Sequence, residues 1–248
     1  MLNIVIPMAG RGSRFQKAGY AFPKPLIDID GKTMIELVIR NLKPTCDHKF
    51  ICICQREHCE KYDLHNIIGN ATDNKFEIVK INGITQGAAC TVLLATQYIN
   101  NDNNLMIANC DQFIETDIND FIKEARNEKS DGLIMTFRAS HPKWSYARID
   151  TAGKVLETAE KKVISNKATV GLYYFKKGRD FVEGAQSMIY KDIRYNKEFY
   201  VCPVYNELII REKNVYIYDI DSAKMHGLGT PEDVSLFLKK IGRGNLKL

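Results

Sequence analysis

Short apolar runs rich in β-branched and aromatic residues recur along the chain, and several of them are apolar on both faces. This is typical of buried strands in a largely parallel sheet. The predicted strands cover residues 3–7, 49–54, 76–81, 105–109, 132–137, 169–175 and 215–220. Helix-length segments with apolar residues at three- and four-residue spacing lie between many of them, at residues 33–42, 88–98, 118–128 and 231–241.

This alternation predicts an α/β fold of Rossmann-like type, with a mostly parallel central sheet flanked by helices. Such sheets bind ligands beyond the carboxyl ends of their strands, so motifs that directly follow a strand are the first candidates for a site. No linker or repeat divides the sequence, and we expect one domain over residues 1–248. The less regular segments 144–162 and 196–207 are candidates for the acceptor side of a cleft, and residues 242–248 are expected to form a frayed basic tail.

The composition excludes a disordered or fibrous chain, because 45% of the residues are hydrophobic and 26% are charged. The net charge of +5 is spread along the sequence, which suits small phosphate-bearing ligands better than nucleic acid. No signal-peptide pattern follows Met1, and the apolar runs are far shorter than the roughly 20 residues of a membrane-spanning helix. We therefore expect a cytoplasmic protein that binds neither nucleic acid nor a membrane.

The seven cysteines form no CxxC pair, and most lie in apolar stretches. Six potential zinc ligands do fall close together, at Cys46, His48, Cys52, Cys54, His58 and Cys59. Their spacing matches no familiar zinc module, and two cysteines on one face of a strand are more often buried as small hydrophobic residues. We predict reduced, packed thiols and no zinc.

The strongest chemical signal is the segment A-G-R-G-S-R-F at residues 9–15, followed by F-P-K-P-L at residues 22–26. Gly10 and Gly12 allow the backbone to approach a polyphosphate, and Arg14 and Lys24 add two cations. The loop is neither a dinucleotide fingerprint nor a Walker loop, since Phe15 stands at the third glycine and no G-K-[ST] follows. The alternative interpretation is a simple strand-to-helix turn with solvated basic residues.

These two segments together resemble the signature of the nucleotidyltransferases that make nucleotide sugars and related activated head groups, and later motifs follow in the family's order. The resemblance implies a GT-A-type Rossmann-like fold, with Arg14 and Lys24 as catalytic residues. It assigns nucleotide binding to Met8, Ala9, Gly10, Gly12 and Ser13. The attacking group in such a reaction is the acceptor's own phosphate oxygen, so the protein needs no covalent nucleophile or general base.

The second motif is T-Q-G at residues 85–87, between a predicted strand and a predicted helix. Thr85 and Gly87 suit a helix start by themselves, whereas the amide of Gln86 offers a donor and an acceptor to the edge of a pyrimidine base. The resemblance implies that Gln86 and Gly87 contact the base.

The third motif, Asn109-Cys110-Asp111, ends a predicted strand and resembles the family's G-D motif, with Cys110 in the glycine position. A carboxylate here suits Mg²⁺, so Asp111 is the predicted metal ligand and Asn109 a predicted nucleotide contact. A lone aspartate after a strand can equally be a cap or turn residue.

The segment 225–233 resembles the family's W-x-D-x-G-T-P-E-D element, but the family's second metal-binding aspartate falls on Gly227. Asp219, Asp221 and His226 are candidate substitutes, and we take Asp221 as the second metal ligand; the alternative is binding through Asp111, phosphates and water. Thr230 and Pro231 in this segment are also typical of an ordinary helix start.

Segments 160–162 and 170–175 resemble the stretches that line the acceptor pocket in sugar enzymes. The resemblance implies that the acceptor contacts Glu160, Lys161, Gly171 and Tyr200, although Lys162 replaces a family proline and a Glu-Lys-Lys run is ordinarily solvated surface.

The segment 198–207 and the exact residues of the first motif resemble a small cytidylyltransferase group from bacterial capsule loci, the CTP:phosphoglutamine cytidylyltransferases of capsular phosphoramidate synthesis. This implies CTP and L-glutamine phosphate as substrates, Mg²⁺ as cofactor, and CDP-L-glutamine and pyrophosphate as products. The alternatives are a sugar-1-phosphate nucleotidyltransferase using dTTP or UTP, a GT-A glycosyltransferase, which the lack of a D-x-D motif disfavours, and a noncatalytic nucleotide-binding subunit. The oligomeric state stays open, a homo-oligomer included.

Overall fold

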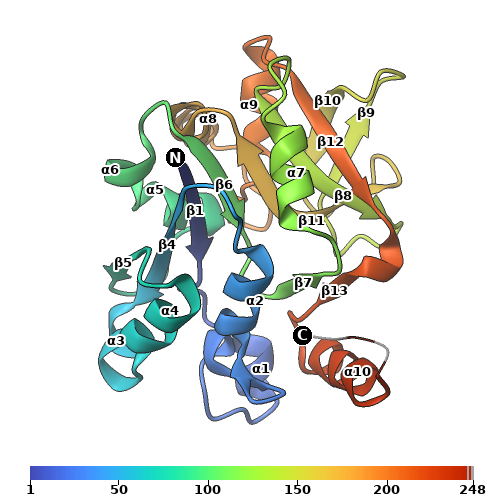
Figure 1. Cartoon of the computed structure of the whole chain (residues 1–248). Coiled ribbons are helices and arrows are strands. Elements are labelled where there is room, and N and C mark those ends of the chain that lie inside the picture. The colour runs from blue at the N-terminus through green and yellow to red at the C-terminus, as the bar shows by residue number, and fades with distance from the viewer. Residues whose placement is uncertain (245, 247–248) are drawn as a thin grey trace.

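The apolar runs form one central nine-stranded sheet in the computed structural model, which describes residues 1–244 and 246 (Figure 1). All the strands predicted from the sequence are present, with bounds that differ by at most two residues. The sheet contains β1 (Leu2–Pro7), β4 (His48–Gln55), β5 (Phe76–Ile81), β6 (Asn104–Ala108), β8 (Gly132–Arg138), β9 (Tyr146–Ile149), β10 (Val155–Ala159), β11 (Lys167–Phe175) and β12 (Val215–Ile220). Two short ladders lie outside it, β2 (Asp28–Ile29) with β3 (Lys32–Thr33), and β7 (Gln112–Ile114) with β13 (Met225–Gly227).

The sheet is mostly parallel, as predicted. Strands β5, β4, β1 and β6 are parallel neighbours, and β8 and β12 run in the same direction on the far side of β11. Strand β11 is antiparallel to both β6 and β8. A register shift between Thr169 and Tyr173 bends it, so that its beginning also pairs with β9. The carboxyl ends of β1 and β6 consequently meet at one edge of the sheet.

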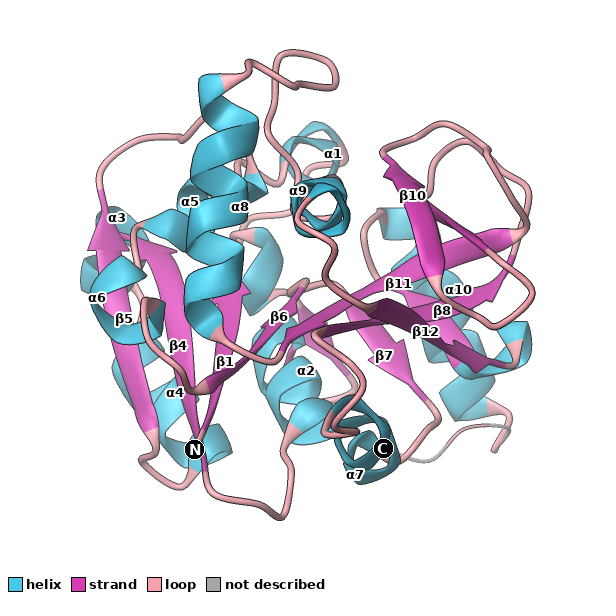
Figure 2. Cartoon of the chain, turned by 90° about the horizontal axis from the view of Figure 1, so that it is seen from above, coloured by secondary structure: helices cyan, strands magenta, loops and turns pink. Residues whose placement is uncertain are grey.

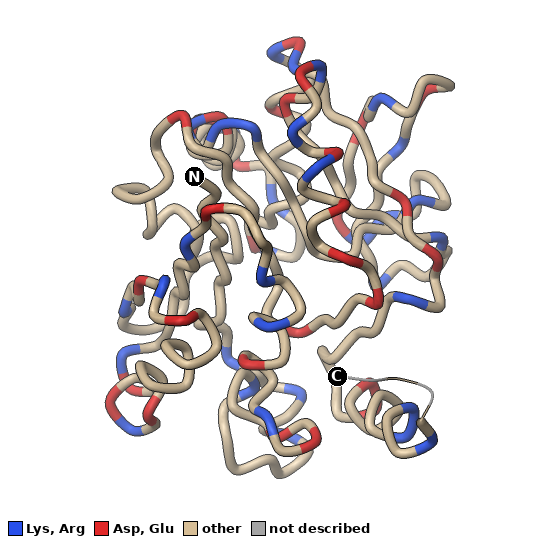
Figure 3. Tube along the Cα trace, viewed as in Figure 1, with Lys and Arg blue, Asp and Glu red and all other residues tan. Residues whose placement is uncertain are grey.

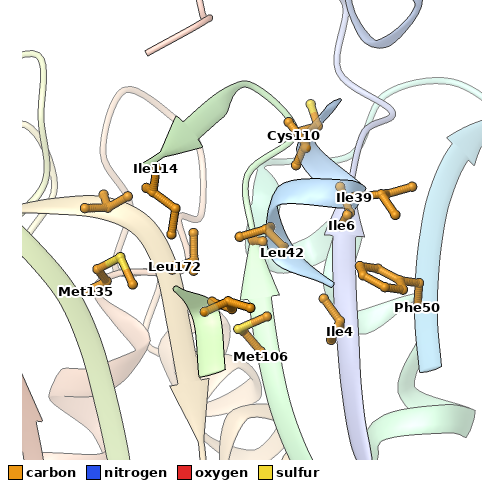
Figure 4. Packing of buried hydrophobic residues seen from close by; sticks show 14 of the residues in the cluster. Ile4, Ile6, Ile39, Leu42, Phe50, Met106, Cys110, Ile114, Met135 and Leu172 are labelled. Atoms are coloured by element: carbon orange, nitrogen blue, oxygen red, sulfur yellow. The ribbon is translucent and has the colours of Figure 1, made fainter. Parts of the chain in front are cut away.

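Helices cover both faces of the sheet (Figure 2). Strand β1 shows why: Leu2, Ile4 and Ile6 pack on one face, and Val5 packs on the other. The first face is covered by α2 (Met34–Leu42), α4 (Leu64–Thr72) and α7 (Ile118–Ala125), and the second by α5 (Ala88–Leu93), α8 (Gly178–Tyr190) and α9 (Val204–Ile210). Figure 4 shows Ile39 and Leu42 of α2 against the strand residues of the first face. Each such buried side chain contributes roughly 1.5–3 kcal/mol.

Local signals set several helix ends. Thr33 and Glu36 form a reciprocal capping box at the start of α2, and Thr230 caps α10 (Pro231–Gly242) before its first-position proline. The helix predicted over residues 88–98 is instead divided into α5 and α6 (Thr96–Ile99). The Thr96 hydroxyl donates a hydrogen bond to the Leu93 carbonyl. At the same place the backbone N–H groups of Leu94 and Ala95 bond to carbonyls three residues earlier in the chain, as in a 3₁₀ turn.

The predicted helix 118–128 ends three residues early, at Ala125, where Arg126 leaves the helical conformation. The pattern analysis did not identify α3 (Arg56–Lys61), α4, α8 or α9 as helices. The thirteen-residue α8 starts at Gly178 and carries a second glycine, Gly184, among its buried residues, and glycine weakens a helical pattern.

A third apolar cluster joins the two ends of the chain. Phe15 of α1 (Ser13–Lys17), Met34 of α2 and Phe237 of α10 belong to it, as does Leu246, which is only 4% exposed. The prediction of a frayed tail from residue 242 is therefore wrong for Leu246, because this side chain is buried; residues 245, 247 and 248 lie outside the described part.

Charged residues of both signs are interspersed along the trace in Figure 3, in agreement with the diffuse net charge. Within the residues that the structure describes, no helix combines the length and the apolar character needed to cross a bilayer. Cys52, Cys54, Cys110 and Cys202 are buried as free thiols, as predicted, while Cys46, Cys59 and Cys90 are partly buried. Across the described residues, no three His, Cys, Asp or Glu side chains are grouped as a metal site would require.

Candidate functional site

The glycine loop, residues 8–14, follows β1 at the carboxyl edge of the sheet. Gly12 has a left-handed φ of 61°, and a side chain there would come within 3.1 Å of the Lys24 Cβ atom. Gly12 is therefore required both for the turn and for the close approach of η1 (Lys24–Leu26). Gln55, which the sequence analysis did not single out, supports the loop by donating from Nε2 to the Ala9 carbonyl at 2.7 Å.

Two of the predicted site residues form an ion pair across this edge. The Lys24 Nζ atom lies 3.0 Å from Asp111 Oδ2. Burial by itself would lower the pKa of Lys24, but the interactions with Asp111 and Cys110 together outweigh it, and the pKa lies above its ordinary value. Lys24 is accordingly a fixed cation at neutral pH, and the pair brings the glycine-loop side of the site to the end of β6.

A cavity of about 540 Å³ opens beside this ion pair. Its walls include residues from the first, third and acceptor motifs. Eight predicted site residues line it: Arg14, Lys24, Asn109, Asp111, Glu160, Lys161, Gly171 and Tyr200. The other predicted residues, Met8, Ala9, Gly10, Gly12, Ser13, Gln86, Gly87 and Asp221, do not line it. The two irregular segments do reach the cavity, through Trp144 and Glu160 in one and through Tyr200 and Cys202 in the other.

Gly171 occupies a crowded point of the cavity wall. Its φ is 98°, and a Cβ atom there would lie 2.3 Å from Asn109 Nδ2 and 2.5 Å from Gln112 Oε1. The Gly171 carbonyl accepts from the Asn109 backbone N–H at 3.0 Å and from Gln112 Nε2 at 3.3 Å. Gln112 lines the cavity, and its buried Oε1 lacks a protein partner among the described residues, so this acceptor is unsatisfied within the protein. The sequence analysis missed Gln112, although it directly follows Asp111.

The acceptor motif contributes two ionisable groups, Glu160 and Lys161, to the cavity wall. Glu160 is buried and accepts a hydrogen bond from Ser145 Oγ, and its pKa is raised because burial disfavours the charged carboxylate. The Lys161 Nζ atom donates to the Tyr200 hydroxyl at 3.0 Å, and that hydroxyl donates to Glu198 at 2.6 Å. Lys161 has a left-handed φ of 50°, a conformation that turns this lysine away from ordinary strand geometry.

The carboxylates suggested as a second metal ligand lie in different places. Asp221 caps the short helix η2 (Ser222–Lys224) by accepting from the Ala223 N–H, and Asp219 pairs with Lys167 at 2.7 Å. Asp233, to which the sequence analysis gave no role, does line the cavity. Its carboxylate lies 3.9 Å from the point where a side chain at position 227 would begin. The neighbouring element β13 is held beside Asp111 by its pairing with β7.

His226, the remaining candidate, is buried beside β7. Its Nε2 faces Glu115 Oε1 at 2.5 Å, and its Nδ1 lies 3.3 Å from Lys240 Nζ. Burial, with Lys240 adding to it, lowers the pKa of His226. The ring does not line the 540 Å³ cavity.

The Gln86 side chain is exposed and accepts a hydrogen bond from Arg194. Gly87 begins α5 with a φ of 120° and is packed against the backbone of Phe199. This end of α5 also contributes Ala88 to the cavity wall. The second motif is thus adjacent to the cavity through Ala88, which follows Gly87.

Sequence comparison places this architecture among known proteins. The family model described as nucleotidyl transferase matches residues 4–198. The bifunctional protein GlmU of Methanocaldococcus jannaschii is 24% identical over 187 residues, covering 71% of this chain and 40% of that protein. The chain therefore spans about two fifths of the length of this curated relative.

Solved structures show the same fold over nearly the whole chain. The nucleoside-diphosphate-sugar pyrophosphorylase from Vibrio cholerae RC9 is 29% identical with a TM-score of 0.83, covering 95% of this chain and 99% of that chain. The inositol-1-phosphate CTP transferase from T. maritima has a TM-score of 0.75 at 15% identity, covering 98% of this chain and 96% of that chain. The second likeness concerns the fold alone.

Proposed function

The chain belongs to the nucleotidyl transferase family, and on this premise we propose that it transfers CMP from CTP to L-glutamine phosphate. A phosphate oxygen of the acceptor attacks the α-phosphorus of CTP and forms a new P–O bond. The bond from that phosphorus to the oxygen bridging to the β-phosphate breaks, and pyrophosphate leaves with the electron pair. The products are CDP-L-glutamine and pyrophosphate. The observation that carries the proposal is the Lys24–Asp111 pair at the wall of a 540 Å³ cavity.

The nucleotide phosphates are assigned to the glycine loop side of the cavity. Lys24 and Arg14 line it and supply two cations. Backbone N–H groups of residues 8–13 would complete the phosphate-binding site. The space beside Gly10 is open, because no atom lies within 4 Å of the position that a Cβ atom would take there. Phosphoryl displacement is catalysed mainly by positioning and by compensation of negative charge, which these groups provide.

Members of this family typically use a divalent cation, and the residues around Asp111 fit Mg²⁺. Asp111 presents carboxylate oxygens at the cavity wall with 25% of its side chain exposed. Mg²⁺ is commonly held by one or two carboxylates together with phosphate oxygens and water. Asp111 would hold the ion, with Asp221 or Asp233 as the second carboxylate. When bound, the ion neutralises charge on the phosphate oxygens.

The acceptor is assigned to the part of the wall that carries Glu160 and Lys161. Lys161 would hold its phosphate, while Glu160 and the unpartnered Gln112 Oε1 offer acceptors to N–H or O–H groups. Gly171 and Tyr200 shape the space between them. The amide and ammonium of a glutamine derivative would satisfy such acceptors. The likeness of residues 198–207 to capsule-locus cytidylyltransferases supports this acceptor, and the need for CTP places the proposed activity in the cytoplasm.

A second candidate function is sugar-1-phosphate nucleotidyl transfer from UTP or dTTP. It is favoured by the 29% identity to the nucleoside-diphosphate-sugar pyrophosphorylase of Vibrio cholerae RC9. Sugar hydroxyls would also donate to Glu160 and Gln112, so the acceptor wall accommodates both classes.

The deciding experiment measures pyrophosphate release with Mg²⁺ from CTP, UTP and dTTP, each combined with L-glutamine phosphate, glucose 1-phosphate and inositol phosphate. We expect release from CTP with L-glutamine phosphate and a product with the mass of CDP-L-glutamine. Lys24→Ala and Asp111→Asn should each slow it by roughly 10²–10³-fold. Arg179→Ala is the control, because Arg179 pairs with Asp102 away from the cavity. Release from UTP or dTTP with a sugar phosphate would establish the second candidate instead, and no release in any combination would contradict both.

A further inference from the structure

We propose that Arg194 is a specificity-determining residue that holds the oxygen end of the Gln86 amide toward itself, presents the N–H₂ end to the base, and so selects cytosine over uracil and thymine. This inference rests on the proposed function and on the base contact that the family resemblance implies for Gln86, beside Ala88 at the cavity wall. It concerns the hairpin of residues 194–200 and in particular Arg194, to which the sequence analysis gave no role.

The hairpin is a well-defined structural unit. Tyr195 and Glu198 exchange both backbone hydrogen bonds, at 3.0 and 2.9 Å. The two residues between them, Asn196 and Lys197, have φ values of 46° and 67°. Two consecutive left-handed residues are what a two-residue hairpin turn matching the strand twist requires. Arg194 thus projects from a fixed turn.

The backbone of Gln86 is fixed by the same hairpin. The Phe199 N–H donates to the Gln86 carbonyl at 2.7 Å, and the Phe199 carbonyl accepts from the Ala89 N–H at 3.0 Å. A Cβ atom at Gly87 would lie 2.4 Å from the Phe199 oxygen, so only glycine permits this approach. Phe199 is itself only 1% exposed. Gln86 therefore has a set position before any ligand arrives.

The guanidinium of Arg194 is held on three sides. Its Nε donates to Asp192, its Cζ atom lies 4.3 Å from the centre of the Phe199 ring, and its Nη1 donates to Gln86 Oε1 at 3.0 Å. A guanidinium has donors and no acceptor, so the amide must turn its oxygen toward Arg194. This contact fixes the orientation of the amide, and its N–H₂ end is the end offered to a ligand.

Base chemistry turns this orientation into selectivity. Cytosine presents two adjacent acceptors, N3 and O2, which can both face an amide N–H₂ group. Uracil and thymine carry an N–H at position 3, which would meet the Gln86 donors and lose its hydrogen bond. A polar group left unpaired on binding is the strongest source of discrimination between similar ligands.

The test compares Arg194→Met, which removes the donors, with Arg194→Lys, which keeps a donor of similar reach. We expect the chain to prefer CTP over UTP and dTTP, and Arg194→Met to reduce that ratio of kcat/KM values by about tenfold, one missing discriminating contact. Arg194→Lys should retain most of it. Arg211→Met is the matched control, since Arg211 binds Glu183 and does not line the cavity.

Calorimetric dissociation constants for CTP and UTP, measured without acceptor, provide a readout that does not depend on turnover. An unchanged CTP:UTP ratio in Arg194→Met, or a native chain that prefers UTP or dTTP, would overturn the role of Arg194 while leaving nucleotidyl transfer in place. If no substrate combination yields pyrophosphate, the proposed function fails, and the binding ratio alone still decides whether Arg194 sets the base preference.

Discussion

The Lys24 ammonium lies 3.0 Å from the Asp111 carboxylate, although the two residues are separated by 87 positions in the sequence. The contact exists because β1 and β6 are parallel neighbours, so the segments that follow them reach the same edge of the sheet. It joins the predicted phosphate-binding lysine to the predicted metal ligand. Before substrate binds, each of the two charges stabilises the charged form of the other.

Lys24 and Asp111 should act as one unit in catalysis. We expect Lys24→Met to lower kcat by roughly 10²–10³-fold, as for loss of one preorganised charge-stabilising group. Asp111→Asn should have a comparable effect, and the double variant should lose much less than the product of the two. Steady-state kinetics on all three proteins measures this, and multiplicative losses would show that the residues act separately. Lys167→Met is the control, because the Lys167–Asp219 pair lies off the cavity.

Gly171→Ala should impair acceptor binding. The added Cβ would meet Asn109 and Gln112 at 2.3 and 2.5 Å, and a side chain at φ 98° costs about 1–3 kcal/mol of strain as well. We expect the acceptor KM to rise at least about tenfold because these amides must move. Gly153→Ala is the matched control: its φ is 82°, but nothing lies within 4 Å of the new Cβ atom. Equal kinetics in the two variants would argue against a crowded acceptor wall.

Glu160 makes the free energy of unfolding depend on pH, and the direction follows from its raised pKa. Burial raises the pKa of Glu160 in the folded state. Its contribution to the free energy of unfolding is therefore favourable at low pH and is lost as the pH rises through the folded-state pKa. Glu160→Gln keeps the shape and removes the charge. We expect a higher Tm than the native chain above that pKa and convergence of the two values in acid, together with weaker acceptor turnover. A Tm difference that does not vary with pH would contradict burial of the charged form.

The identity of the second carboxylate can be resolved by Mg²⁺ titration of activity. Asp233 lines the cavity near Gly227, whereas Asp221 caps η2. We expect Asp233→Asn to raise the Mg²⁺ concentration for half-maximal rate by about tenfold, the scale seen when a group supporting a metal is removed. The shift for Asp221→Asn should be smaller. The reverse order would assign the second ligand to Asp221, the choice made from the sequence.

The sequence by itself determined the class of fold and the first motif. Alternating strand and helix periods predicted a mostly parallel sheet, and the cavity contains Arg14, Lys24 and Asp111 from motifs that follow β1 or β6. These features depend on short-range physics: side-chain periodicity within one element, and glycine and proline chemistry within one turn. Such signals are complete within a window of a few residues.

Only the tertiary structure decided which distant side chains face one another. The position of Gly171 over Asn109 and Gln112, the access of Asp233 to the cavity, and the hold of Arg194 on Gln86 each join segments far apart in the chain. Leu246 likewise has no local periodic signal, yet it is buried against α10 and its neighbours. Contacts of this kind follow from sheet order and strand register, which no local pattern encodes.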